Sequence, residues 1–257
     1  MSHPFVEADS PGTPKSAIWP GRFNGRVIVV TGAAGGLGSA ARSRLEAEGA
    51  TVVAADAIPV DPADPGRVSF DVRDRDAWVD VISTLIRKHG RLDGALFCHG
   101  VQGPEFTVAD MPVDGWARCM DVNLTGCFHG LAVILPHLTE RGYGRVAVLS
   151  SIAAREGNPY QAAYSCSKAA VIALVKTAAK ETAKDGVTVN AIAPSMFETP
   201  LLKGLSPERN AQLLARVPMG RIGQPPEFAG LAAFLLSKEA SYMTGQTLDL
   251  SGGRNTS

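Results

Sequence analysis

The 257-residue chain has no excess of charge of either sign, with 25 Lys and Arg against 25 Asp and Glu. Proteins that bind nucleic acids or anionic membranes by charge carry a basic surplus, so this balance argues against both partners. No apolar run reaches the roughly 18 residues that a membrane-spanning helix needs. Residues 1–20 contain four prolines and no apolar signal core, and the sequence therefore predicts a cytoplasmic protein.

Cysteine and histidine are scarce, at four and five residues, and neither falls into a CxxC or HExxH pattern. Zinc sites and redox-active pairs need such spacings, so no metal site is expected and the cysteines are predicted to be reduced thiols. A chain of this length can bury about 70–75% of its unfolded surface, which is enough to fold without disulfides or metals.

Short, continuous apolar runs alternate with helical patterns from residue 26 onward. Continuous runs are typical of strands that are covered on both faces, as in parallel sheets. The pattern predicts an α/β fold, a single Rossmann-type doubly wound sheet of about seven parallel strands with helices on both faces. The expected strands are 27–31, 51–55, 68–70, 95–98, 146–150, 187–192 and 247–250.

The domain organisation follows from composition. Residues 1–22 are predicted to be a flexible arm, and residues 23–257 a dinucleotide-binding catalytic domain with an apolar substrate lid near 195–220. Three prolines between Asp56 and Asp71 forbid the usual crossover helix, so an extended crossover is expected there. An apolar stripe from Trp116 to Leu135 predicts a helix ahead of Pro136.

A glycine-rich turn joins the first expected strand to the first expected helix. It contains Gly32, Gly35, Gly36, Leu37 and Gly38. Glycines permit positive φ and a close approach of backbone to pyrophosphate, and a helix N-terminus attracts anions. The turn predicts a dinucleotide site, with an ordinary tight turn as the alternative.

Asp56 ends the second expected strand, 18 residues after Gly38. An acid at this point accepts hydrogen bonds from the adenosine ribose and repels a 2′-phosphate. Residues 33–35 supply no cation. The sequence therefore predicts NAD rather than NADP as the cofactor, and the alternative is a solvated loop carboxylate.

Tyr164 and Lys168 are four residues apart in an expected helix, which puts them on one face. A phenol has a pKa near 10 in water, and a neighbouring ammonium favours its ionised form. Such a tyrosine can exchange a proton with a substrate oxygen. Ser151 follows an expected strand, at the edge of the sheet where ligands bind in open α/β folds. Each feature alone is weak, and their combination is specific.

Over residues 24–253 the sequence resembles the classical short-chain dehydrogenases/reductases. Both the motifs and their separations fit this family, including the placement of Tyr164 13 positions after Ser151. The matching residues are Thr31-Gly32-x-x-x-Gly36-x-Gly38, Asp71-Val72, Asn123, Ser151, Tyr164-x-x-x-Lys168, Asn190, Pro194, Thr199, Gly245, Gly252 and Gly253.

The resemblance implies catalytic roles for four residues. Tyr164 would be the acid/base, and Ser151 would orient the substrate oxygen. Lys168 would lower the pKa of Tyr164 and bind the nicotinamide ribose. Asn123 would hold a water that links Lys168 to solvent. It can also satisfy backbone groups at a helix kink, and the two roles are compatible.

The resemblance also implies contacts to the cofactor. Asp71 would bind the adenine amino group with Val72 against the ring, and Ile192 and Thr199 would contact the carboxamide side of the nicotinamide. The implied cofactor-binding residues are Gly32, Gly35, Gly36, Leu37, Gly38, Asp56, Asp71, Val72, Gly100, Tyr164, Lys168, Pro194 and Thr199.

Two departures from the family pattern lie near the expected cofactor. Phe97-Cys98-His99-Gly100 replaces the usual Asn-Asn-Ala-Gly, and Pro194-Ser195 replaces Pro-Gly. His99 has either a local electrostatic role or is a packed, hydrogen-bonded histidine.

These patterns lead to an NAD(H)-dependent oxidoreductase that interconverts a secondary alcohol and a ketone. Two alternatives stay open: an enzyme acting on 3-oxoacyl or 3-hydroxyacyl thioesters of acyl-carrier protein or CoA, and a catalytically silent NAD-binding module. The expected partner is a small-molecule alcohol or ketone. The resemblance also implies a homo-oligomer, either a tetramer or a dimer.

Overall fold

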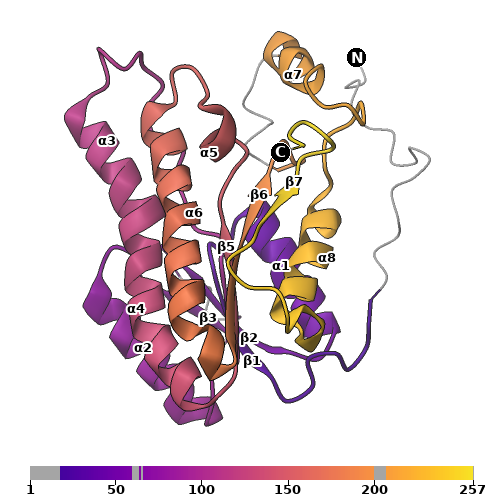
Figure 1. Cartoon of the computed structure of the whole chain (residues 1–257). Coiled ribbons are helices and arrows are strands. Elements are labelled where there is room, and N and C mark those ends of the chain that lie inside the picture. The colour runs from indigo at the N-terminus through magenta and orange to yellow at the C-terminus, as the bar shows by residue number, and fades with distance from the viewer. Residues whose placement is uncertain (1–17, 60–63, 65, 200–206, 257) are drawn as a thin grey trace.

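A computed structural model of the chain describes residues 18–59, 64, 66–199 and 207–256. Parallel strands form one sheet in the order β3-β2-β1-β4-β5-β6-β7, with helices on both faces (Figure 1). The strands are β1 (Val27–Thr31), β2 (Thr51–Asp56), β3 (Arg67–Ser69), β4 (Gly94–Phe97), β5 (Gly144–Leu149), β6 (Val187–Pro194) and β7 (Thr247–Leu250). The helices are α1 (Gly36–Ala47), α2 (Arg75–His89), α3 (Val113–Met120), α4 (Gly126–Glu140), α5 (Ala153–Glu156), α6 (Ala162–Thr182), α7 (Pro207–Leu214) and α8 (Pro225–Leu236).

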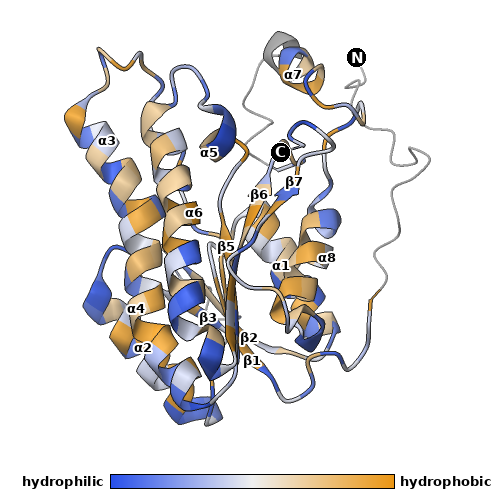
Figure 2. Ribbon diagram, viewed as in Figure 1, coloured by the Kyte–Doolittle hydropathy of each residue, from blue (hydrophilic) through white to orange (hydrophobic). Residues whose placement is uncertain are grey.

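The predicted doubly wound sheet is confirmed, and every predicted strand ends within two residues of an observed one. Alternate residues of the central strands β1, β2, β4, β5 and β6 enter two separate cores. Val29 of β1 packs with Trp78 of α2 in one core, while Val30 packs with Leu45 of α1 and Phe228 of α8 in the other. Figure 2 shows the hydrophobic strands between helices whose hydrophilic residues lie mainly on the outer sides. Burial on both faces explains why these central strands are largely apolar.

The predicted helix ahead of Pro136 is longer than the sequence indicated. α3, a π-helical turn at Asp121–Thr125 and α4 form one continuous helix, Val113–Glu140, which passes through Pro136. By length and composition this helix is apolar enough to cross a membrane. Its buried residues Leu131 and Ile134 pack into the sheet core, as in the core helix of a globular domain.

Several predictions fall wholly or partly outside the described residues. The described part of the β2–β3 crossover contains no helix, but residues 60–63 and 65 are not described. The same holds for residues 1–17 of the predicted arm and residues 200–206 of the predicted lid. Where the described chain begins, the Trp19 amide donates to Glu48, and Arg22 pairs with Glu48 and Glu239. Residues 18–22 thus contact the ends of α1 and α8.

The order of the strands creates a crevice above β1 and β4. After β1 the chain adds β2 and β3 on one side, and then crosses to the other side of β1 to form β4. Helices α1 and α2 therefore lie on opposite faces of the sheet (Figure 1). The loops that follow β1 and β4 diverge at this point, which is where open α/β sheets bind ligands.

Candidate active site

The glycine-rich turn after β1 has no room for side chains at two positions. Gly32 has φ +64°, and a Cβ there would lie 2.7 Å from the carbonyl carbon of Cys98 and from the amide nitrogen of His99. A Cβ on Gly38 would overlap the carbonyl oxygen of Gly32. α1 starts after Gly35 without a capping side chain or an acidic residue in its first turn. Its first amide groups therefore remain available to an anion, so the turn fits a dinucleotide phosphate.

Asp56 lies beside this turn at the end of β2. Its Oδ2 accepts a hydrogen bond of 2.9 Å from the Ala34 amide, and its Oδ1 accepts one of 3.3 Å from Ile58. The nearby Arg42 of α1 is bound by Glu46 and by both carboxylate oxygens of Asp64. The local guanidinium is thus already paired with carboxylates, and Asp56 is placed to accept hydrogen bonds from a ribose.

Asp71 and Val72 follow β3. The Arg73 guanidinium binds Asp71 at 2.5 Å and holds the pKa of that carboxyl below its usual value. Val72 packs against the core, and its carbonyl accepts a hydrogen bond of 2.9 Å from the Trp78 indole. The carboxylate of Asp71 is therefore ionised and already shared with a cation.

Asn123 lies in the π-helical turn and is fully buried. Its Oδ1 accepts from the Val101 amide at 2.8 Å, and its Nδ2 donates to the Val101 carbonyl at 2.9 Å and to Ser167 Oγ at 3.0 Å. A Cβ on Gly100 would lie 3.1 Å from Asn123 Oδ1 and 3.2 Å from Lys168 Nζ. The amide thus satisfies backbone groups of the loop after β4, one of its two expected roles, and lies close to the lysine.

Lys168 is almost fully buried, and its ammonium donates to the Leu149 carbonyl at 2.7 Å. Ser150 Oγ donates to the Lys168 carbonyl at 2.9 Å, which ties α6 to the end of β5. Ser151 is buried beside them, and its Oγ accepts from the Ala153 amide at 3.1 Å. Its own proton is therefore free to be donated to a substrate oxygen.

One cleft of about 690 Å³ brings many of the predicted residues together. Those that line it are Leu37, Gly100, Ser151, Tyr164, Lys168, Pro194 and Thr199. Asn123 lies behind its wall. Of the remaining predicted residues, Gly32 and Gly35 lie in the turn after β1, Gly36 and Gly38 open α1, Asp56 ends β2, and Asp71 and Val72 follow β3. Three strand ends, those of β4, β5 and β6, therefore supply the floor of this cleft.

Ser195 lines the cleft directly after Pro194. Its hydroxyl oxygen is buried and has no hydrogen-bond partner among the described residues. A buried hydroxyl without a partner is costly, so such a group at a ligand site indicates a partner supplied by the ligand. Together with the glycine-rich turn, it makes these residues fit a bound dinucleotide.

His99 is a packed histidine. Its Nδ1 lies 2.6 Å from Thr31 Oγ1, and its Nε2 lies 3.4 Å from Cys127 Sγ. Burial and the nearby Lys168 lower its pKa to about 3, so the imidazole is neutral at physiological pH. The structure supports the packed, hydrogen-bonded interpretation over an electrostatic role.

Ile192, an expected contact of the nicotinamide, does not line the cleft. Ile192 is fully buried in the core below α8, whereas Phe197 lines the cleft.

Sequence reasoning also missed Tyr160, which lines the cleft with φ +66°, a rare value for a residue other than glycine. It missed Arg216 and Arg254 as well, both of which line the cleft. No local motif marks them, because distant segments bring them there.

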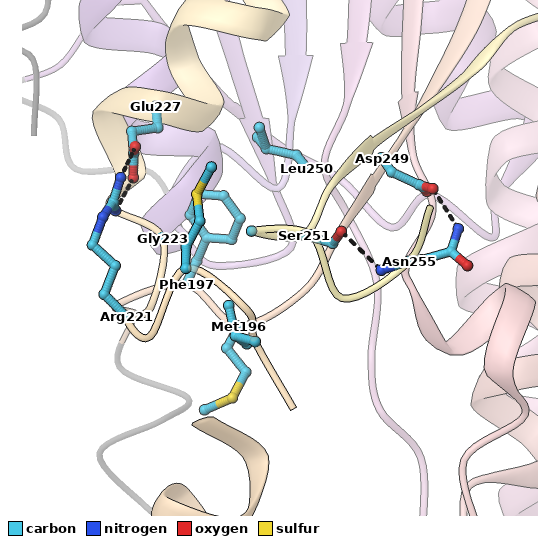
Figure 3. Close-up of a pocket in the computed structure, with 13 residues that line it drawn as sticks. Met196, Phe197, Arg221, Gly223, Glu227, Asp249, Leu250, Ser251 and Asn255 are labelled. Carbon is cyan, nitrogen blue, oxygen red and sulfur yellow. Dashed lines mark hydrogen bonds and ion pairs between the residues drawn. The ribbon is translucent and has the colours of Figure 1, made fainter. Parts of the chain in front are cut away.

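A second pocket of about 330 Å³ lies behind Met196 and Phe197, both of which also line the cleft (Figure 3). At its edge Arg221 and Glu227 form two parallel bonds of 2.9 and 2.7 Å. Asn255 donates to Asp249 at 2.5 Å on the other side. The carboxylate of Glu227 thus neutralises the charge of Arg221.

Comparison with known proteins agrees with this geometry. A family model described as "Enoyl-(Acyl carrier protein) reductase" matches residues 32–255. The 2-dehydro-3-deoxy-L-rhamnonate dehydrogenase (NAD(+)) of Sphingomonas sp. (strain SKA58) is 37% identical over 247 residues, which cover 93% of this chain and 99% of that protein. This chain belongs to the short-chain dehydrogenase/reductase family.

Other members of the family carry different activities. The 3-oxoacyl-[acyl-carrier-protein] reductase of Thermotoga maritima is 37% identical over 244 residues, which cover 90% of this chain and 98% of that protein. A crystal structure of NAD+-bound xylitol dehydrogenase superimposes with a TM-score of 0.85 at 33% identity, covering 90% of this chain and 99% of the other. The chain is therefore an NAD(P)-dependent short-chain dehydrogenase/reductase that acts on CH–OH groups.

Proposed function

We propose that this protein is an NAD(H)-dependent oxidoreductase that interconverts a secondary alcohol and a ketone, with Tyr164 as the acid/base. The observation that carries the proposal is the convergence of Ser151, Tyr164 and Lys168 on one cleft. That cleft lies at the carboxyl edge of the sheet, next to the glycine-rich turn.

Each side chain has a distinct task in this proposal. Ser151 donates its hydroxyl proton to the substrate oxygen, and Tyr164 accepts or returns the proton of that oxygen. Lys168 stays buried through its bond to the Leu149 carbonyl and presents its charge to the phenol. Asn123 holds the loop at Val101, which keeps Gly100 against the lysine. A bound nicotinamide supplies or accepts the hydride.

The preference for NAD rests on Asp56. Its carboxylate already accepts from the Ala34 amide, so it is fixed beside the phosphate turn. A ribose hydroxyl can donate to it, whereas a 2′-phosphate would bring a second negative charge against it. Arg42 offers no compensation, because Asp64 and Glu46 bind its guanidinium.

The proposal is tested by NADH oxidation with a panel of ketones, using the Tyr164→Phe variant. We expect turnover to fall by about 10²–10⁴-fold, because the proton donor is lost, while the Kd for NADH stays near that of the wild type. Tyr242→Phe is the matched control, since this side chain is fully exposed and lies away from the cleft. Near-normal turnover of Tyr164→Phe would refute the mechanism.

A second candidate function is the reduction of 3-oxoacyl thioesters. It is favoured by the 37% identity to the reductase of T. maritima and by the apolar residues Met196 and Phe197 at the cleft. A comparison of acetoacetyl-CoA with simple ketones, each with NADH and NADPH, separates the two. A preference of more than about tenfold for the thioester would favour this alternative.

We also infer that the protein is a cytoplasmic homo-oligomer, either a tetramer or a dimer. The helix Val113–Glu140 exposes Val113, Trp116 and Phe128, which a neighbouring copy could cover. Light scattering on the purified protein measures the assembly directly. A monomer at micromolar concentration would contradict the inference.

A further inference from the structure

Two arginines from distant parts of the chain line the same cleft as Tyr164. Arg216 follows α7 in the predicted lid, and Arg254 lies near the C-terminus. Both bind Glu156 at the end of α5. Arg254 makes two bonds to this carboxylate, at 2.8 and 2.5 Å, and Arg216 makes one of 2.8 Å.

The carboxylate neutralises only part of this charge. Two guanidinium groups share one carboxylate, which leaves one positive charge in excess. Glu156 does not itself line the cleft, whereas both arginines do. Arg254 holds the pKa of Glu156 below its usual value, so the carboxylate is already ionised at neutral pH.

The other charged groups at the described part of the cleft do not remove this excess. Glu105 accepts a bond of 2.9 Å from Gln161 and is the only acidic residue in the described lining. Lys168 adds a further positive charge. Behind the wall, Arg155 and Asp249 pair with each other at 3.2 Å. Counting Glu156 with the lining, three cations face two carboxylates.

Arg216 also has donors to spare. A guanidinium carries five N–H groups in a planar fork that matches a carboxylate. The described residues take a single bond from Arg216, through Nη2, and half of its side chain is exposed. Arg221 beside the second pocket differs, because Glu227 binds both of its terminal nitrogens in parallel (Figure 3). Both terminal nitrogens of Arg221 are therefore occupied by Glu227, whereas Arg216 has N–H groups that can bind a further anion.

We propose that Arg216 and Arg254 form an anchor for a substrate carboxylate, so that the substrate is a hydroxy acid or the corresponding oxo acid. This inference rests on the proposed function: the carbinol of the substrate would lie at Ser151 and Tyr164, and its carboxylate at the two arginines. A substrate carboxylate bound here would cancel the remaining positive charge of Arg216, Arg254 and Glu156.

The test compares carboxylates with their amides. Cyclohexanecarboxylate and cyclohexanecarboxamide are titrated into the NAD-loaded protein by calorimetry, followed by acetate and acetamide as a smaller pair. We expect each acid to bind about 10- to 100-fold more tightly than its amide, as hydrogen bonds to charged groups require. The preference should weaken as salt is raised, because Arg216 is partly exposed.

Variants distinguish a carboxylate anchor from arginines that only hold Glu156 in place. In Arg216→Gln we expect the acid-to-amide ratio to fall close to one, with partial recovery in Arg216→Lys, which keeps the charge but loses the fork. Lys88→Gln removes the same charge from an exposed position near the end of α2 and should keep the wild-type ratio. An acid-to-amide ratio near one in the wild type, or a ratio unaffected in Arg216→Gln, overturns the proposal.

The binding assay needs no turnover, so the two proposals can fail separately. A wild-type preference for acids together with a fully active Tyr164→Phe variant would contradict the mechanism and leave the anchor standing. A wild-type protein that reduces ketones through Tyr164 but binds acids no better than amides would contradict the anchor and leave the mechanism standing.

Discussion

Replacing Gly38 with alanine isolates the contribution of the phosphate turn. The added methyl would overlap the carbonyl oxygen of Gly32, and would lie 2.9 Å from its carbonyl carbon and 3.1 Å from Ala33 Cα. All three are backbone atoms, so the turn itself must shift by about 1 Å. Overpacking of this kind costs about 1–3 kcal/mol, which for a chain of this size lowers Tm by roughly 2–12 °C. The displaced amides should raise the Kd for NAD at least about tenfold.

The matched control is Gly230→Ala in α8. Nothing lies within 4 Å of a Cβ at that position, and alanine is favoured over glycine inside a helix by about 1 kcal/mol. Calorimetry for NAD binding and thermal melting of both variants give the comparison. Gly230→Ala should raise Tm and leave the Kd unchanged. If Gly38→Ala binds NAD as tightly as the wild type does, the turn is not the phosphate site.

Three further outcomes are expected. Asp56→Ala should reduce the ratio of Kd for NADPH to that for NADH by about tenfold, as measured by fluorescence titration, and an unchanged ratio would remove Asp56 from the selection of cofactor. Ser195→Ala should raise the Tm of the cofactor-free protein by roughly 2–4 °C and reduce the gain on adding NAD, because its hydroxyl has no partner until the ligand binds. Arg221 holds the pKa of Glu227 below its unfolded value of 4.5, so this pair stabilises the fold above that pH and loses its effect as pH falls through the folded value. Glu227→Gln should therefore flatten the decline of Tm below about pH 5, and parallel melting curves for the two proteins would argue against the linkage.

The fold could be predicted from the sequence because its signals are local. The central strands β1, β2, β4, β5 and β6 are largely apolar and contribute residues to both cores, so their burial is already visible in the sequence. The helix through Pro136 was less predictable. Proline disfavours the helix interior, but here packing of Leu131 and Ile134 into the sheet core accompanies a helix that runs on to Glu140.

The candidate site was predictable only where its residues follow strand ends or share a helix face. Ser151, Tyr164 and Lys168 meet this condition. Arg216 and Arg254 do not, because their approach to Glu156 depends on how the segment after α7 and the segment after β7 pack against α5. Phe197 lines the cleft and Ile192 does not for a similar reason: β6 is buried on both faces, so its contribution to the cleft begins at Pro194, the last residue of the strand.

The π-helical turn at Asp121–Thr125 sets the rotational phase of everything after it. A π turn holds one residue more than an α-helical turn, and each residue of an α-helix advances the side chains by about 100°. Deleting one residue from this turn would regularise the helix, but would also rotate Leu131 and Ile134 away from the sheet, unless Asn123 were rotated instead. A regular α-helix could not place both Asn123 at Val101 and the side chains of Leu131 and Ile134 in the core. The extra residue of the π turn allows both contacts in one continuous helix.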